Sequence, residues 1–461
     1  MTIRAALTAA LALPVLAAAI DSKWLQSSYQ GGENAPGWQE GDANGQTVFL
    51  AGQEDITGTG QLDHCPTIFI GSAAVDGTPD EGWKQLPNLV GFDLQRLPLE
   101  GYGSAVLPFF VERGKDAANI KRVVIAQPGK PRDAWKYVNL LRNSLICAAA
   151  NDSDPVNMDE VLIAAPIWLN DYDQKAGAVG ENDVYFKSSR WFEGGMSVGP
   201  GDTQISSVTA MDALVAHFFD AAAFPAVGQV VTAGHSMGAQ FTQRYALMRD
   251  ADDKDDKMRY WVGNPGSFAW ITEDRPKTID ASCSDSYNSW PYGGSTTHAL
   301  HPFPSTFKKE FKSNWDGVVA RYRARYMRHA QGLADNGPGD THCEAQAQGA
   351  SHLERGQGFE QMLTNMEGGM PGRAKFDYIE GVSHQDYPMM GAAISQHRIF
   401  REVNGQDDTD AGVNPSAAGA GGASAKRGAA EGRDHNAAGA ARTVGLTGVG
   451  VMLAAVVALV V

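Results

Sequence analysis

Short apolar runs alternate with longer amphipathic stretches along most of the chain. The runs are rich in Val, Ile and Leu and lie between turn residues, which predicts buried β-strands. The predicted strands cover residues 90–94, 104–112, 123–126, 161–165, 229–233, 259–263 and 325–332, and a last one begins at Phe376. Because buried strands separated by helices form parallel sheets with both faces covered, the pattern predicts an α/β fold with a mostly parallel sheet.

Helices are predicted where apolar residues recur at helical spacing. In residues 206–222, for example, Met211, Leu214 and Phe218 fall on one side of a helix. The same kind of pattern predicts helices over residues 135–145, 236–249 and 343–366. No repeat and no second rhythm marks another domain, so we expect one folded domain over residues 20–404.

Two intervals lack this periodicity. We expect a long irregular insertion over residues 166–201. Residues 280–306 are rich in aromatic, Ser and Gly residues, which predicts a lid or a substrate-facing loop. Trp191, Trp290 and Tyr292 lie in these intervals and are candidates either for the lining of an acyl or aryl pocket or for plain packing.

The first 19 residues have the pattern of a secretory signal peptide. Arg4 precedes an apolar run, and Ala17-Ala18-Ala19 forms a small-residue cleavage pattern. The alternative is a membrane anchor, but the run is short for a bilayer span and contains Pro14.

The other end of the chain resembles a signal for a glycosylphosphatidylinositol (GPI) anchor. Residues 443–461 end in an uncharged apolar tail, and residues 405–442 are rich in Ala and Gly, which predicts a disordered stalk. The attachment site is predicted within residues 428–430 or at Asn436. A transmembrane helix is the alternative, although the tail is shorter than the roughly 20 residues of a span. We therefore expect the protein at the outer face of the plasma membrane or in the cell wall.

The composition argues against a nucleic-acid-binding protein. The 461 residues include 53 Asp and Glu against 38 Lys and Arg, a net charge of −15. Nucleic-acid binding draws much of its affinity from basic residues, which this chain lacks in any long run. Since 43% of the residues are hydrophobic, the chain can bury a large core. The sequence does not indicate an oligomeric state.

In a secreted protein, the cysteines are expected to form disulfides. Cys65, Cys147, Cys283 and Cys343 are even in number, which predicts two disulfides with three possible pairings. None has the spacing of metal ligands, so we expect no metal site. Asn151 begins the sequence Asn-Asp-Ser and is a candidate N-glycosylation site.

The strongest chemical signal is the motif G-x-S-x-G at residues 234–238. It joins a predicted buried strand to a predicted helix, which is the context of a nucleophile elbow. Such a turn holds the serine hydroxyl above the sheet, so Ser236 is the predicted nucleophile. A structural Gly-rich turn is the alternative.

A nucleophilic serine needs a histidine and an acid. His384 follows the last predicted strand and is the candidate base. The candidate acids are Asp335, in a Gly-x-x-Asp step after the strand 325–332, and Asp340, five residues later. The oxyanion hole is predicted to use the backbone N–H of Met237 together with that of Gly129 or Lys130.

With these motifs the sequence resembles the α/β-hydrolase superfamily, in particular secreted fungal members that contain a run like C-E-A-Q-A-Q-G-A-S-H-L-E-R-G at residues 343–356. The resemblance spans residues 90–400. It implies an α/β-hydrolase fold and a serine hydrolase that acts on esters or related acyl compounds without a cofactor. The resemblance does not specify the substrate; we expect a small-molecule or polymer-linked carboxylic ester, and a loop-rich lid formed by the irregular intervals. An acyltransferase or peptidase with the same triad, and a cell-surface recognition protein that only keeps the fold, remain alternatives.

Two weaker signals have simple explanations. The carboxylates of residues 250–257 alternate, but they lack the Gly and the distal Glu of a calcium loop, so we expect a solvated turn. His298 and His301 form a loose pair without a third ligand in register, which argues against a metal site.

Overall fold

The computed structural model describes residues 75–403, except for residues 90, 150, 152–154 and 298–299. They belong to the first of two compact units, Met1–Asn414; the second, Pro415–Val461, lies outside the described residues. The predicted signal peptide, stalk and apolar tail also lie outside them and stay predictions, as do statements about Cys65 and His298. No helix within the described part of the chain combines the length and apolar character needed to cross a membrane.

An eight-stranded sheet forms the centre of the described unit, in the order β12-β11-β10-β9-β5-β6-β4-β3. Only β4 runs antiparallel to its neighbours, β3 and β6; the other pairs are parallel. The prediction of a mostly parallel α/β sheet is confirmed. The strands are β3 (Phe92–Pro98), β4 (Val106–Glu112), β5 (Arg122–Gln127), β6 (Val161–Pro166), β9 (Gln229–His235), β10 (Met258–Gly263), β11 (Met327–Gly332) and β12 (Ala374–Ile379).

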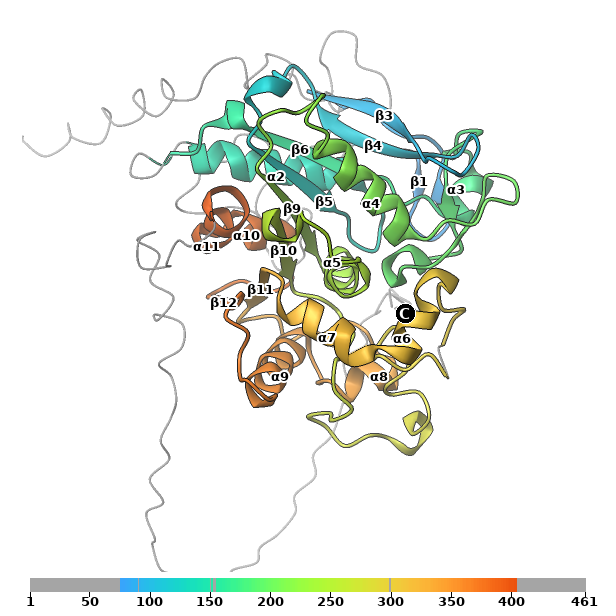
Figure 1. Ribbon diagram of the computed structural model, residues 1–461, viewed down its shortest axis with the longest axis vertical. Helices are drawn as coiled ribbons and strands as arrows, with labels where there is room; N and C mark the ends of the chain where they lie inside the picture. The colour runs from blue at the N-terminus through green and yellow to red at the C-terminus, as the bar shows by residue number, and fades with distance from the viewer. Residues whose placement is uncertain (1–74, 90, 150, 152–154, 298–299, 404–461) are drawn as a thin grey trace, which may run out of the picture. The chain divides into compact units, whose positions relative to one another are not determined.

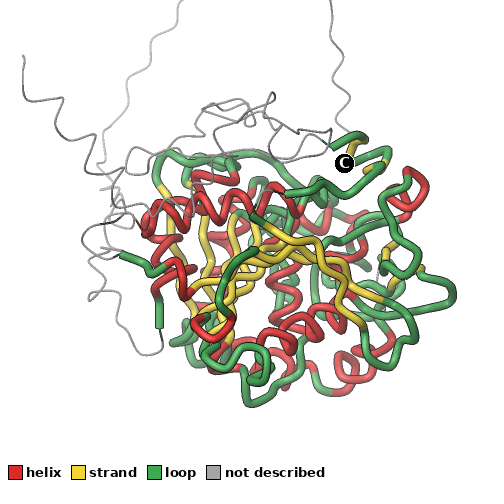
Figure 2. The backbone as a smooth tube through the Cα atoms, turned by 90° about the horizontal axis from the view of Figure 1, so that it is seen from above, coloured by secondary structure: helices red, strands yellow, loops and turns green. Residues whose placement is uncertain are grey.

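Helices cover both faces of this sheet (Figures 1 and 2). One face packs against α2 (Ala134–Ala149), α10 (Asp386–Gly391), α11 (Ala393–Gln396) and a final π-helical turn (His397–Arg401). The other face packs against α4 (Ser207–Phe218), α5 (Met237–Met248), α6 (Ser305–Ser313), α7 (Trp315–Arg323) and α9 (His352–Asn365).

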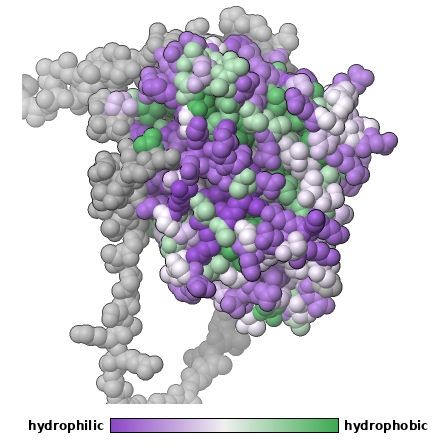
Figure 3. Space-filling model, in the orientation of Figure 1, coloured by the Kyte–Doolittle hydropathy of each residue, from purple (hydrophilic) through white to green (hydrophobic). Residues whose placement is uncertain are grey.

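The alternation of side chains along the strands explains why the core has two layers. Along β5, Val123 and Ile125 face the layer with α4 and α5, whereas Val124 and Ala126 face the layer with α2. All four are fully buried, as expected for a central parallel strand with both faces covered. The surface drawn in Figure 3 is correspondingly mostly hydrophilic.

The long helix predicted over residues 343–366 is wrong, because the structure breaks it into two. A short helix, α8 (Cys343–Gln346), ends before Gly349, whose φ of +156° continues no helix. Ser351 then caps α9 by accepting a hydrogen bond from the Glu354 N–H at 3.2 Å. The break places residue 352 at the start of a new helix, beside the loop that follows β11.

The insertion predicted over residues 166–201 contains short regular elements. These are α3 (Asp171–Ala176), β7 (Tyr185–Phe186) and β8 (Ser197–Gly199), with a 3-10 turn at Arg190–Glu193. A further pair of short strands, β1 (Gly77–Thr78) and β2 (Gly82–Trp83), precedes the central sheet. The segment 280–306 has, among its described residues, only a 3-10 turn at Ala281–Cys283 before α6 begins.

Candidate active site

Ser236 lies at a sharp turn between β9 and α5. Its φ of +57° is unusual for a residue with a side chain, and such strain is typical of a nucleophile elbow. The two motif glycines make the turn possible. A Cβ atom on Gly234 would lie 2.2 Å from the carbonyl oxygen of Gly238, and one on Gly238 would lie 2.2 Å from the carbonyl oxygen of Gln127. Both glycines are therefore needed for the close packing around the elbow.

The structure brings Ser236 together with His384 and Asp335. The Nε2 atom of His384 lies 3.0 Å from the Oγ atom of Ser236, and its Nδ1 atom lies 2.7 Å from Oδ2 of Asp335. The acid follows β11 and the histidine follows β12, at the carboxyl edge where β9 also ends. The three side chains thus form one continuous hydrogen-bond chain, in the order Ser, acid, His along the sequence.

Asn264 fixes the loops that deliver these groups, and sequence reasoning missed it. It has a φ of +45° directly after β10. Its side chain accepts from the Gly332 N–H at 2.8 Å and donates to the Ser383 carbonyl at 2.8 Å. It therefore ties the ends of β10 and β11 to the loop that carries His384. The available signal was a polar residue at the carboxyl end of a buried strand.

A second histidine, His352, contacts the same carboxylate. Its Nδ1 atom lies 3.1 Å from Oδ1 of Asp335, and its ring stacks on that of His384 with centroids 4.1 Å apart. Burial alone would raise the pKa of Asp335, but His352 and His384 outweigh it and hold that pKa well below its usual range. The acid therefore stays ionised at neutral pH. Sequence reasoning missed His352, although it lies within the run that carries the family resemblance.

Another His–Asp contact lies beside the elbow. The Nδ1 atom of His235, which precedes the serine, lies 2.5 Å from Oδ1 of Asp386, and its ring centroid is 4.7 Å from that of His384. Asp386 also pairs with Lys136 and accepts from the Tyr137 hydroxyl at 3.0 Å. Burial lowers the pKa of His235 although Asp386 opposes the shift. His235 is therefore neutral near pH 7.

Asp340, the alternative acid, points elsewhere. It accepts from the Tyr292 hydroxyl at 2.7 Å and lies 2.6 Å from Nδ1 of His342. Its backbone carbonyl accepts from Arg355 at 2.7 Å. Of the two candidate acids, Asp335 is the one that contacts His384.

The predicted oxyanion donors lie on the two sides of the elbow. Met237 is the first residue of α5, and the first N–H groups of a helix have no partner within the helix. Gly129 and Lys130 follow β5, whose end touches the elbow at Gly238. The loop is thus next to the nucleophile, and the identity of the second donor remains a prediction.

The order of the strands, the single antiparallel strand β4 and the serine at the elbow after β9 decide the fold class. The chain has the α/β-hydrolase fold. No protein-family model and no curated protein sequence matches this amino-acid sequence.

Several solved structures resemble the fold. Poly(aspartic acid) hydrolase-1 from Sphingomonas sp. KT-1 has 16% identity and a TM-score of 0.45, and the match covers 67% of this chain and 98% of that one. LpqC, a poly(3-hydroxybutyrate) depolymerase from Bordetella parapertussis, has 17% identity and a TM-score of 0.43, with coverage of 69% and 93%. The siderophore hydrolase EstA from Aspergillus nidulans has 10% identity and a TM-score of 0.35, with coverage of 66% and 92%.

One of the two predicted disulfides is described. Cys283 bonds to Cys343 and so joins the segment 280–306 to the start of α8. Since these sulfurs are oxidised, their proximity to Glu344 forms no thiolate metal site. Asp335, His352 and His384 also place ligand atoms within 4.8 Å of one another. In that cluster, Oδ2 of Asp335 and Nδ1 of His384 are already paired with each other in the triad.

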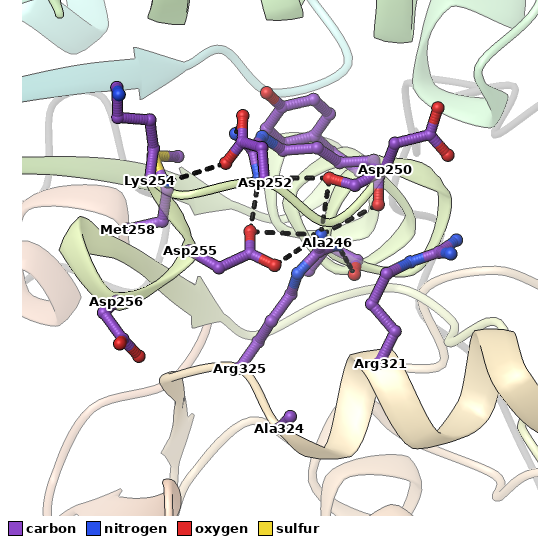
Figure 4. Close-up of polar contacts among 12 residues, drawn as sticks. Ala246, Asp250, Asp252, Lys254, Asp255, Asp256, Met258, Arg321, Ala324 and Arg325 are labelled. Carbon is purple, nitrogen blue, oxygen red and sulfur yellow. Dashed lines mark hydrogen bonds and ion pairs between the residues drawn. The ribbon is translucent and has the colours of Figure 1, made fainter.

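The Asp-rich turn over residues 250–257 is an ion-pair cluster (Figure 4). Arg249 contacts Asp252 at 2.6 Å and also pairs with Asp255, and Arg325 reaches Asp255 at 3.2 Å. Asp253 pairs with Lys254 at 2.6 Å and Asp256 with Arg373 at 2.6 Å, so four of the five carboxylates of the turn have a basic partner.

The other residues singled out in the sequence mostly lie in the packed interior or in surface loops. Trp191 and Trp290 are buried, and the Nε1 atom of Trp290 donates to the Glu193 carbonyl at 2.8 Å. His301 lies 2.8 Å from the Glu193 carboxylate, which links the segment 280–306 to the 3-10 turn at Arg190–Glu193. Asn151 is exposed, as a glycosylation site requires.

Proposed function

We propose that this protein is a secreted, surface-anchored serine hydrolase that cleaves carboxylic esters through an acyl-enzyme intermediate and needs no cofactor. The observation that carries the proposal is the unbroken hydrogen-bond chain from Ser236 through His384 to Asp335. A structural Gly-rich turn has no use for a histidine and an ionised acid aligned on its serine. Ester cleavage is the activity that the family resemblance implies.

Acylation begins when the Oγ atom of Ser236 attacks the ester carbonyl carbon. His384 accepts the hydroxyl proton on Nε2, and the carbonyl oxygen becomes an oxyanion held by the N–H of Met237 and by Gly129 or Lys130. The ester C–O bond then breaks, and His384 returns the proton to the leaving alkoxide, which departs as an alcohol. Asp335 keeps the Nδ1–H tautomer and stabilises the imidazolium.

Deacylation repeats these steps with water. His384 removes a proton from the water molecule as its oxygen attacks the acyl carbon, and the same proton then returns to Ser236 as the carboxylic acid leaves. A removed donor of the oxyanion hole typically costs about 3–4 kcal/mol of barrier height.

The proposed location rests on the two chain ends and on the disulfide. A signal peptide and a lipid-anchor signal direct the domain outside the cell, and the Cys283–Cys343 bond fits an oxidising compartment.

A panel of short-chain, long-chain and aryl esters tests the activity. We expect hydrolysis of at least one class by the purified protein and a loss of about 10⁴-fold or more in kcat for Ser236→Ala. Folded wild-type protein that hydrolyses no ester, or a Ser236→Ala variant that keeps the activity, would contradict the proposal.

A further inference from the structure

The mechanism leaves two buried histidines beside the base, His235 and His352, without a task, and of these His352 contacts the acid Asp335. The side chain of His352 is 7% exposed, and its ring lies flat against that of His384 with an interplanar angle of 29°. Burial and the neighbouring His384 lower the pKa of His352, although Asp335 opposes the shift. A neutral imidazole therefore lies beside the base at neutral pH.

The backbone around His352 is tied to the acid loop. Its N–H donates to the Gly337 carbonyl at 3.1 Å, and the N–H of Leu353 donates to the Asp335 carbonyl at 3.1 Å. Gly339 packs against the opposite edge of the ring, because a Cβ atom on Gly339 would lie 2.3 Å from Nε2. These contacts leave the Nδ1 edge directed at the carboxylate.

The two facing atoms have only each other. Oδ1 of Asp335 and Nδ1 of His352 are 3.1 Å apart, but their alignment falls short of a hydrogen bond, and neither atom has any other partner among the described groups. Because Asp335 is an ionised acceptor, the neutral imidazole must present its Nδ1–H to satisfy it. The other oxygen, Oδ2, faces His384.

We propose that His352 is a positioning residue of the active site, which donates its Nδ1–H to Asp335 Oδ1 and so fixes the plane of the carboxylate for His384. The inference rests on the proposed function, since it assigns a role within the same triad. Two donors on two oxygens leave the carboxylate one orientation. The shared bond also limits how much of its negative charge is available to His384.

The pH dependence of the reaction at Ser236 depends on the groups that face His384. They are Asp335 and His352 on one side, and His235, backed by Asp386, with Ser236 on the other. Arg355 lies behind His352 on the same helix.

Two variants of His352 separate its donor from its ring. His352→Phe keeps a stacked ring but loses the donor, whereas His352→Asn keeps an amide donor near the Nδ1 position but loses the ring. The readout is the pH profile of the rate at which a fluorophosphonate labels Ser236. It needs no knowledge of the natural substrate, and the midpoint of its acidic limb reports protonation of His384.

We expect His352→Phe to lower the plateau rate about tenfold to 100-fold, because a carboxylate with one free oxygen no longer holds the base in one geometry. Its acidic midpoint moves to higher pH, since the whole charge of Asp335 then favours the imidazolium. We expect His352→Asn to stay within about threefold of the wild type. His342→Phe, whose exposed imidazole pairs with Asp340 instead, is the matched control and leaves both quantities unchanged.

The inference is overturned if His352→Phe keeps the wild-type plateau rate and acidic midpoint, or if the Phe and Asn variants lose the same amount of labelling rate. Either result leaves the proposed function intact. Failure of the wild type itself to label would overturn the proposed function. Should His352→Phe not fold, ¹⁵N-histidine NMR of the wild type decides the matter. The Nδ1–H tautomer of His352 supports the inference, and the Nε2–H tautomer contradicts it.

Discussion

At the residue scale, the two aspartates of one loop have separate tasks. Asp335 binds the imidazole of His384, whereas Asp340 binds Tyr292 and His342. Both have lowered pKa values although burial works against ionisation, so charge alone does not distinguish them. Hydrogen-bond geometry does.

This difference gives a paired prediction. Asp335→Asn removes the acceptor that selects the productive tautomer of His384, and we expect kcat to fall by about 10⁴-fold. Asp340→Asn is the matched control, with kcat expected within about threefold of the wild type because no triad atom is touched. Steady-state ester hydrolysis by both variants, with folding checked by circular dichroism, makes the comparison. A larger loss for Asp340→Asn would reverse the assignment.

At the element scale, the active site depends on close contact between the end of β5 and the start of α5. Gly238 permits that contact, since its Cβ position lies 2.2 Å from the Gln127 carbonyl oxygen. The same approach brings the loop with Gly129 and Lys130 to the nucleophile. Packing and oxyanion-hole formation therefore depend on one missing side chain.

We expect Gly238→Ala to destabilise the protein by about 1–3 kcal/mol and to lower kcat more than a stability loss explains, because the oxyanion loop is pushed outward. Gly372→Ala is the control, since nothing lies within 4 Å of its Cβ position. Thermal denaturation and ester hydrolysis of the two variants test this. Equal behaviour of the pair would show that the close contact is unimportant.

The element scale also shows what the sequence could predict. The sheet, its parallel strands and the elbow follow from buried apolar runs and a motif in its required context, and most strand bounds agree within two residues. The break between α8 and α9 was not predicted, because the apolar spacing over residues 343–366 continues through Gly349 and hides the new start at Ser351.

Site residues could be predicted from the sequence where a motif or the end of a strand marked them. Residues that belong to the site only through tertiary contacts could not. Ser236, His384 and Asp335 each follow a strand in the order that this fold requires. Asn264 and His352 contribute through contacts with residues that are distant in the sequence. Asn264 contacts Gly332, 68 residues away, and His352 contacts Asp335, 17 residues away. Local sequence carries no record of such pairings.

At the scale of the whole molecule, the two chain ends predict where the enzyme works. A GPI anchor replaces the apolar tail with a lipid that a phosphatidylinositol-specific phospholipase cleaves. We expect that phospholipase to release the protein from membranes of the producing cells in active form. Asn436→Gln, together with substitution of residues 428–430 by bulky residues, removes both candidate attachment sites and should abolish anchoring. Retention after the phospholipase treatment would favour the transmembrane alternative.

The central claim is that Ser236 is the activated nucleophile of this molecule. Its most direct test is to treat the folded protein with a fluorophosphonate probe and to map the adduct by peptide mass spectrometry. We predict one adduct on Ser236, which is lost in Ser236→Ala and slowed in His384→Ala. No labelling of folded protein, or labelling that persists in Ser236→Ala, would contradict the account.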